Sequence, residues 1–181
     1  MNPMSGIMAK SPIAAVISPD QNRPLVSEVT DNKRILLDRK AAQIDAFFAK
    51  YKLPMEGYGE KLVLEADKNG LEPDMIALVA LVESTGCKFI IEGTNNCFGW
   101  GSGKIRFKSI DESIEKVAAA LAGNDPATER YYKDKPMDEI LQIYNGYAND
   151  KYLTNIKTLR KQIEKMQVPE TQFASASLKV S

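Results

Sequence analysis

The chain of 181 residues has no histidine, and it has only two cysteines and one tryptophan. Without histidine, the usual zinc ligand sets and the histidine-based nucleophile triads cannot be built. No apolar run approaches the roughly 20 residues that a membrane-spanning helix needs, so we expect no membrane span. Any chemistry must therefore come from carboxylates, hydroxyls and backbone groups, and we expect no metal and no cofactor.

The chain also lacks an excess of charge of either sign. Its 24 basic and 24 acidic residues cancel to a formal net charge of +0, which leaves no electrostatic footprint for nucleic acid or an anionic membrane. The hydrophobic share of 44% and the charged share of 27% are ordinary for a globular domain with one core. We therefore expect one folded domain that is a monomer and binds no nucleic acid.

The organisation of the chain follows from where its helical periodicity begins and ends. Residues 1–31 contain four prolines and little periodicity, which predicts a flexible N-terminal arm. A short apolar stretch in this arm, Ile13 to Ile17, does not clearly amount to a signal peptide. Residues 32–167 carry the periodic pattern of the folded domain. Residues 168–181 are rich in serine, alanine and threonine, which predicts a disordered tail.

Within the domain, apolar residues at helical spacing predict a mainly α fold. Amphipathic helices are expected at 32–51, 58–68, 109–122, 136–146 and 150–166. Between residues 86 and 108 the helical period disappears and glycines become frequent, at positions 93, 99, 101 and 103. Glycines permit positive backbone torsions, so this segment predicts a small hairpin or looped lobe, the one β-like part of the fold.

The segment Glu72 to Gly86 is the most apolar of the chain, and it predicts a buried central helix. Pro73 suits a first helical position, Asp74 complements the positive end of the helix dipole, and Gly86 can supply a left-handed end. Glu83 falls in the last turn, where apolar neighbours and the negative end of the dipole both oppose ionisation. This makes Glu83 a candidate general acid, although a glutamate at a helix end is more often simply solvated.

Four short segments follow one another in an order that is informative. They are Glu83-Ser84-Thr85-Gly86, Asn95-Asn96-Cys97-Phe98-Gly99-Trp100-Gly101, Ile143-Tyr144-Asn145-Gly146 and Tyr147-Ala148-Asn149-Asp150-Lys151-Tyr152. Together they resemble the lysozyme-like superfamily, specifically bacterial endo-β-N-acetylglucosaminidases and soluble lytic transglycosylases that cut peptidoglycan. The resemblance covers roughly residues 35–166. The third segment is similar to a transglycosylase motif. The fourth is similar to a glucosaminidase motif but is one residue short.

The resemblance implies an α+β lysozyme-like fold with the catalytic Glu83 between two lobes. It implies that Tyr144 directs its hydroxyl towards Glu83 or the sugar, with Tyr147 as the competing match and a core tyrosine as the alternative for Tyr144. Ser84 would bind Glu83 or the substrate, unless it bonds the preceding turn. The residues implied to line the sugar sites are Asn96, Phe98, Gly99 and Trp100.

A second carboxylate is the open question of the expected site. Glu92 is the only acid between Glu83 and Asp111, so it is the candidate, although acids in loops are mostly solvated. Many glucosaminidases of the resembling family carry another acid in a β-hairpin beyond the catalytic helix, and residues 98–107 here contain none. The sequence therefore fits the single-acid scheme of the transglycosylases better.

The function expected from the resemblance is cleavage of peptidoglycan glycan strands, by a glucosaminidase or a lytic transglycosylase. The alternative is a non-catalytic glycan-binding module that keeps the cleft. A wall substrate implies an extracytoplasmic location, secreted or wall-associated. In that setting the only two cysteines, Cys87 and Cys97, favour a disulfide, with two buried free thiols as the alternative.

Overall fold

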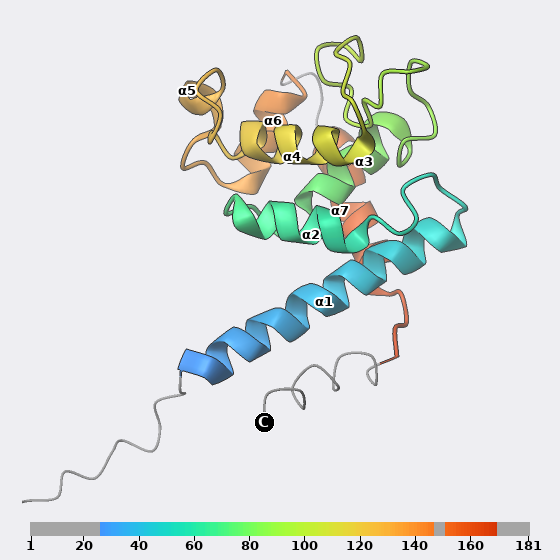
Figure 1. Cartoon of the computed structure of the whole chain (residues 1–181), viewed down its shortest axis with the longest axis vertical. Helices are drawn as coiled ribbons and strands as arrows, with labels where there is room; N and C mark the ends of the chain where they lie inside the picture. Colours follow the sequence, from blue (N-terminus) through green and yellow to red (C-terminus); the bar gives the residue numbers. More distant parts are fainter. Residues whose placement is uncertain (1–25, 147–150, 170–181) are drawn as a thin grey trace, which may run out of the picture.

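The computed structural model describes residues 26–146 and 151–169, and this part of the chain is mainly helical and contains no strand (Figure 1). The mainly α class predicted from the sequence is confirmed. The described helices are α1 (Val26–Lys50), α2 (Gly59–Lys68), α3 (Met75–Ser84), α4 (Ile110–Leu121), α5 (Glu129–Tyr132), α6 (Met137–Tyr144) and α7 (Lys151–Glu164). The expected tail from residue 170 onwards and the first 25 residues of the expected arm lie outside the described residues.

Helix α3 is the centre of the core, as its sequence predicts. Every residue from Met75 to Leu81 is at most 7% exposed, because α2, α4 and α7 all contact this helix. In Figure 1, α2 and α4 lie across the front of the domain, with α3 and α7 behind them and the long α1 below. A helix that buries apolar side chains on all its faces removes more apolar surface from water than a surface helix of the same length. This removal of apolar surface from water is the main contribution of α3 to the stability of the fold.

The helix ends differ from prediction at two places. Helix α1 begins at Val26, inside the segment expected to be a flexible arm. Helix α3 begins at Met75, so Pro73 lies before the helix and not at its first position, and Asp74 precedes it without bonding the first turn through its side chain. The other end of α3 is as expected: Thr85 and Gly86 have φ values of 54° and 61°, and the Gly86 N–H donates to the Ala80 carbonyl at 3.1 Å. This left-handed end fixes where Glu83 lies.

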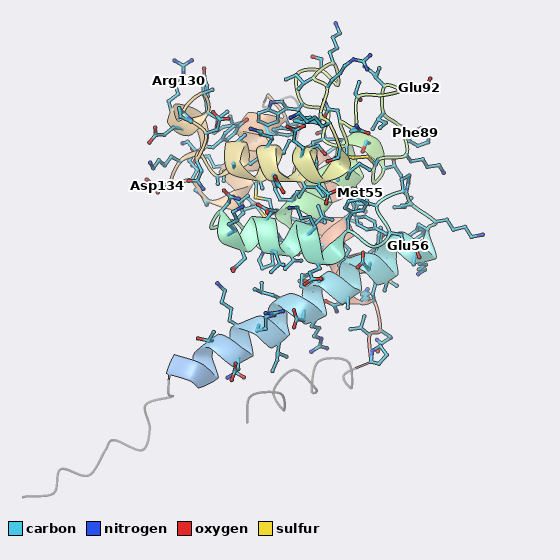
Figure 2. All side chains as sticks on the ribbon, viewed as in Figure 1. Met55, Glu56, Phe89, Glu92, Arg130 and Asp134 are labelled. Atoms are coloured by element: carbon cyan, nitrogen blue, oxygen red, sulfur yellow. A yellow bond between two sulfur atoms is a disulfide. The ribbon has the colours of Figure 1, made fainter. Side chains whose placement is uncertain are left out.

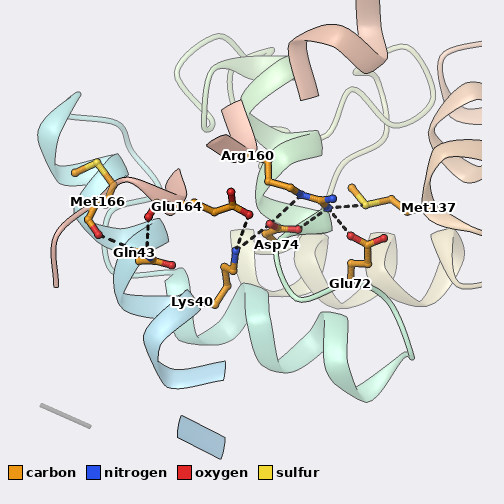
Figure 3. Close-up of polar contacts among 8 residues, drawn as sticks. All are labelled: Lys40, Gln43, Glu72, Asp74, Met137, Arg160, Glu164 and Met166. Carbon is orange, nitrogen blue, oxygen red and sulfur yellow. Dashed lines mark hydrogen bonds and ion pairs between the residues drawn. The ribbon is translucent and has the colours of Figure 1, made fainter. Parts of the chain in front are cut away.

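The carboxylate of Asp74 has a role that its position in the sequence does not predict. Arg160 of α7 donates to both of its oxygens, at 3.1 and 2.7 Å, and Lys40 of α1 lies 3.2 Å away (Figure 3). The Asp74 side chain is only 5% exposed. Glu72 adds an ion pair to Arg160 at 2.6 Å. The network ties α1 and α7 to the start of the helix that ends at Glu83.

The expected β-like lobe, residues 86–108, contains no strand. A strand pair needs a ladder of successive hydrogen bonds, but Gly99, Gly101 and Gly103 have φ values of 67°, 59° and 75°, which turn the chain repeatedly. One backbone bond crosses the segment, from the Phe107 N–H to the Thr94 carbonyl at 2.9 Å. We call residues 86–108 the loop lobe.

Within residues 26–146 and 151–169, no helix combines the length and the apolarity that crossing a bilayer requires.

Candidate functional site

A pocket of about 430 Å³ lies where the end of α3, the loop lobe and the α5–α6 region meet. Its lining residues are Glu83, Gly99, Trp100, Gly101, Ser102, Tyr132, Tyr144 and Asn145. Glu83 is the only carboxylate among them. The pocket therefore combines one acid with aromatic walls, and it brings together Glu83, Gly99, Trp100 and Tyr144 from the residues that the sequence predicts.

Glu83 is open to solvent through this pocket, yet protein atoms crowd its carboxylate. The Tyr152 hydroxyl donates a hydrogen bond to Oε1 at 2.9 Å. On the other side, a Cβ added to Gly99 would lie 2.8 Å from Oε2, and Gly99 has a φ of 67°. The positive φ favours glycine at this position, and a larger residue would also displace the Glu83 carboxylate.

The crowding changes the acidity of Glu83. Desolvation by the surrounding protein raises the pKa of the Glu83 carboxyl above its ordinary value, and the hydrogen bond from Tyr152 opposes that rise. A carboxyl group that holds its proton to higher pH, and that faces a pocket, can act as a general acid.

Tyr144 and Trp100 form the aromatic wall opposite Glu83. Their rings stack with centroids 5.7 Å apart and an interplanar angle of 26°. The Tyr144 hydroxyl does not reach Glu83, because it donates to the backbone carbonyl of Phe98. Burial, and next the charge of Glu83, raise the pKa of Tyr144, so its hydroxyl remains a hydrogen-bond donor at neutral pH. The structure therefore gives Tyr144 a role in holding the loop lobe against α6.

Three residues expected to contact sugar are instead internal supports of the loop lobe. Phe98 is 0% exposed and packs in the core. The side-chain amide of Asn96 donates to the carbonyls of Trp100 and Ile105, at 2.8 and 3.1 Å, and accepts from the Trp100 N–H at 3.0 Å. These bonds use both N–H donors and one of the two acceptor positions of the amide, so Asn96 positions Trp100 rather than an N-acetyl group.

Ser84 is the third internal support, at 3% exposure. Its one O–H is shared between the carbonyls of Cys97, at 2.6 Å, and Ala80, at 3.1 Å, and its oxygen accepts from the Cys87 N–H at 2.8 Å. The bond to the preceding turn is the alternative that the sequence offered, in place of substrate binding. Through the bond to Cys97, Ser84 also joins the end of α3 to the loop lobe.

Two further candidates from the sequence are Glu92 and Tyr147. Glu92, the candidate second acid, is exposed on the outer side of the loop lobe and does not line the pocket with Glu83 (Figure 2). Tyr147, the competing tyrosine, lies outside the described residues. The described site therefore has a single carboxylate.

Sequence reasoning missed Tyr132 and Tyr152. Tyr152 is 69 residues from Glu83 in the chain, and its place on α7 looked like an ordinary buried position. A signal was present, because Tyr152 ends the fourth of the segments on which the resemblance rests. Burial, followed by the charge of Glu83, raises the pKa of Tyr152, which keeps its hydroxyl a donor to Glu83.

Cys87 and Cys97 form a disulfide that closes a loop of sequence separation 10 directly after α3. Both residues are at most 5% exposed. Reduction is expected to destabilise the fold by about 2–3 kcal/mol, the range for so short a closed loop, and to lower the melting temperature. Thermal unfolding with and without reductant measures the effect.

The control for reduction is the double variant Cys87→Ser/Cys97→Ser, whose melting temperature should not respond to reductant. Two reactive thiols in denatured, unreduced protein would contradict the bridge.

Among the described residues, no group of three or more cysteine, aspartate or glutamate side chains is arranged to hold a metal ion. Comparison of the chain with protein-family models, with curated proteins and with solved structures found no match. The function must therefore be argued from the geometry of the pocket.

Proposed function

We propose that this chain is a glycosidase that cleaves the glycan strands of peptidoglycan, with Glu83 as its single general acid. The observation that carries the proposal is the Glu83 carboxyl itself, which ends a buried helix, faces an open aromatic pocket and has a raised pKa. Cleaving a glycosidic bond requires a proton on the leaving oxygen. The flat face of an aromatic ring such as Trp100 is a common platform for a sugar ring, because the C–H face of a pyranose is apolar.

The proposed reaction uses Glu83 twice. The protonated carboxyl gives its proton to the glycosidic oxygen as the bond between that oxygen and the anomeric carbon breaks. The resulting carboxylate is stabilised by the hydrogen bond from Tyr152. Glu83 then takes a proton from the hydroxyl that attacks the anomeric carbon, which belongs to water in a hydrolase or to the sugar itself in a lytic transglycosylase.

The single carboxylate in the pocket favours the route of a lytic transglycosylase, in which the attacking hydroxyl belongs to the sugar itself. A two-carboxylate retaining enzyme places its acids about 5–5.5 Å apart, and an inverting enzyme about 6.5–9.5 Å apart, across the scissile bond. No second acid lines the pocket of Glu83 among the described residues.

We propose that the loop lobe and the helices around α3 form the two sides of a lysozyme-like cleft, in an extracytoplasmic protein whose disulfide suits that setting.

The test is digestion of purified peptidoglycan, followed by mass spectrometry of the released sugar ends. Anhydro ends would identify a lytic transglycosylase, and N-acetylglucosamine reducing ends a glucosaminidase. Binding to peptidoglycan without release of any fragment would overturn the enzyme proposal and support the alternative, a glycan-binding module.

The hydrogen bond from Tyr152 predicts a shift in pH dependence. A general acid works only while protonated, so activity falls as the pH rises through its pKa. The Tyr152 hydroxyl lowers the pKa of Glu83, and Tyr152→Phe removes this effect. The alkaline limb of the kcat/KM profile should therefore move to higher pH in Tyr152→Phe.

The matched control is Tyr131→Phe, because Tyr131 is 44% exposed and does not line the pocket. Its profile should equal that of the unmodified chain. An alkaline limb that stays in place in Tyr152→Phe would show that this bond does not tune Glu83.

A further inference from the structure

A second cavity, of about 270 Å³, shares Trp100 with the Glu83 pocket as a common wall. It lies between the loop lobe and α4. Its lining residues are Trp100, Ile105, Arg106, Phe107, Glu112, Lys116, Val117, Ala120 and Asp125. Whatever occupies this cavity would therefore lie next to a sugar bound in the Glu83 pocket.

The cavity has an apolar base and a charged rim. Val117 and Ala120 are at most 4% exposed and form part of the base, together with Phe107. Arg106 and Lys116 are exposed on the rim. Such a lining suits a small aliphatic group that also carries charge.

The charges on the rim are not equally available to a ligand. Glu112 accepts the backbone N–H of Lys108 at 2.6 Å, and Asp125 accepts that of Ala127 at 2.9 Å, each through one of its two oxygens. Arg106 donates to the Gly93 carbonyl at 3.1 Å through one of its nitrogens. Neither Arg106 nor Lys116 forms an ion pair with another described residue. The rim therefore offers a carboxylate two cations that have no ion pair, beside two acidic side chains that each accept one backbone N–H.

We propose that this cavity binds a short acidic peptide attached to the glycan strand that the Glu83 pocket holds. The inference rests on the proposed function and names the part of peptidoglycan that would be recognised beyond its sugars. Small aliphatic side chains of the peptide lie on Val117 and Ala120, and a peptide carboxylate meets Arg106 and Lys116. The enzyme would then prefer strands that carry peptides over bare strands.

The test uses the full chain with Glu83→Gln, so that nothing is turned over, and a soluble tripeptide of alanine, glutamate and alanine. Because Trp100 is the only tryptophan and forms a wall of the cavity, its fluorescence reports binding. We expect a saturable change with the acidic peptide and none with the same peptide amidated at its carboxylates. Lys116→Gln should weaken binding about fivefold, the effect of losing one partly solvated ion pair.

The matched control is Lys104→Gln, an exposed cation of the loop lobe that does not line the cavity, and it should leave the peptide affinity unchanged. No fluorescence change at millimolar peptide, equal binding of the amidated peptide, or an equal effect of Lys104→Gln would each overturn the proposal. The assay needs neither glycan nor turnover. A failure here leaves the glycosidase proposal standing, and an inactive enzyme leaves the peptide measurement intact.

Discussion

Glu83→Gln is expected to lower the rate of peptidoglycan cleavage by at least about a hundredfold, the lower end for loss of a general acid. Glutamine keeps the size of the side chain, and its amide oxygen can still accept the bond from Tyr152, so the fold should be preserved. The glutamine side chain cannot give a proton to the leaving oxygen. The release of new sugar ends over time measures the rate, and circular dichroism checks the fold.

Glu92→Gln is the matched control, because it makes the same substitution at an exposed glutamate of the loop lobe. Its rate should stay within about twofold of the unmodified chain, as for a surface charge outside the pocket. A large loss in Glu92→Gln would mean a two-carboxylate mechanism after closure of the loop lobe. Full activity in Glu83→Gln would remove the general-acid role altogether.

The position of Glu83 could be predicted because its signals are local. The apolar run before it and the glycine after it define a buried helix and its end within a few residues, and the structure places both where the sequence indicates. The mainly α class follows from the same periodicity. The start of α1 was missed because the residues after Pro24 have a weak apolar pattern, which gives no sign of a helix before residue 32.

The roles of the residues around Glu83 could not be predicted in the same way. An asparagine, a serine or a phenylalanine near the end of α3 is chemically able either to bind a ligand or to support a loop. In the structure, the side chains that support the loop lobe are those of Asn96, Ser84 and Phe98. The direction of each side chain relative to the folded loop decides between the two roles. The glycines of the loop lobe likewise allow a hairpin or a series of turns, and sequence alone does not choose between them.

Contacts between distant segments were the least predictable part of the site. Helices α3 and α7 pack antiparallel, so that Tyr152 reaches Glu83 at one end and Arg160 reaches Asp74 at the other. Each pair is separated by more than 60 residues in the chain, since the separations are 69 and 86. Periodicity shows that α7 has a buried face but not which residues of α3 it meets.

Arg160→Met is expected to lower the free energy of unfolding by about 3 kcal/mol, which is the lower end for breaking a buried ion pair. The variant keeps most of the side-chain volume but leaves the Asp74 carboxylate, 5% exposed, with Lys40 as its remaining cation. An uncompensated buried charge is costly because it has lost water without gaining a full partner. Urea denaturation measures the difference.

Lys157→Met is the matched control on the same helix, since it breaks an ion pair with Asp138 in which both side chains are 57% exposed. Such a surface pair contributes less than about 1 kcal/mol. The double variant Asp74→Asn/Arg160→Met should recover part of the loss, because it removes the charge that the single variant leaves buried. If Arg160→Met and Lys157→Met destabilise the chain equally, the Asp74 network does not hold α7 against α3, and the placement of Tyr152 beside Glu83 must depend on apolar packing alone.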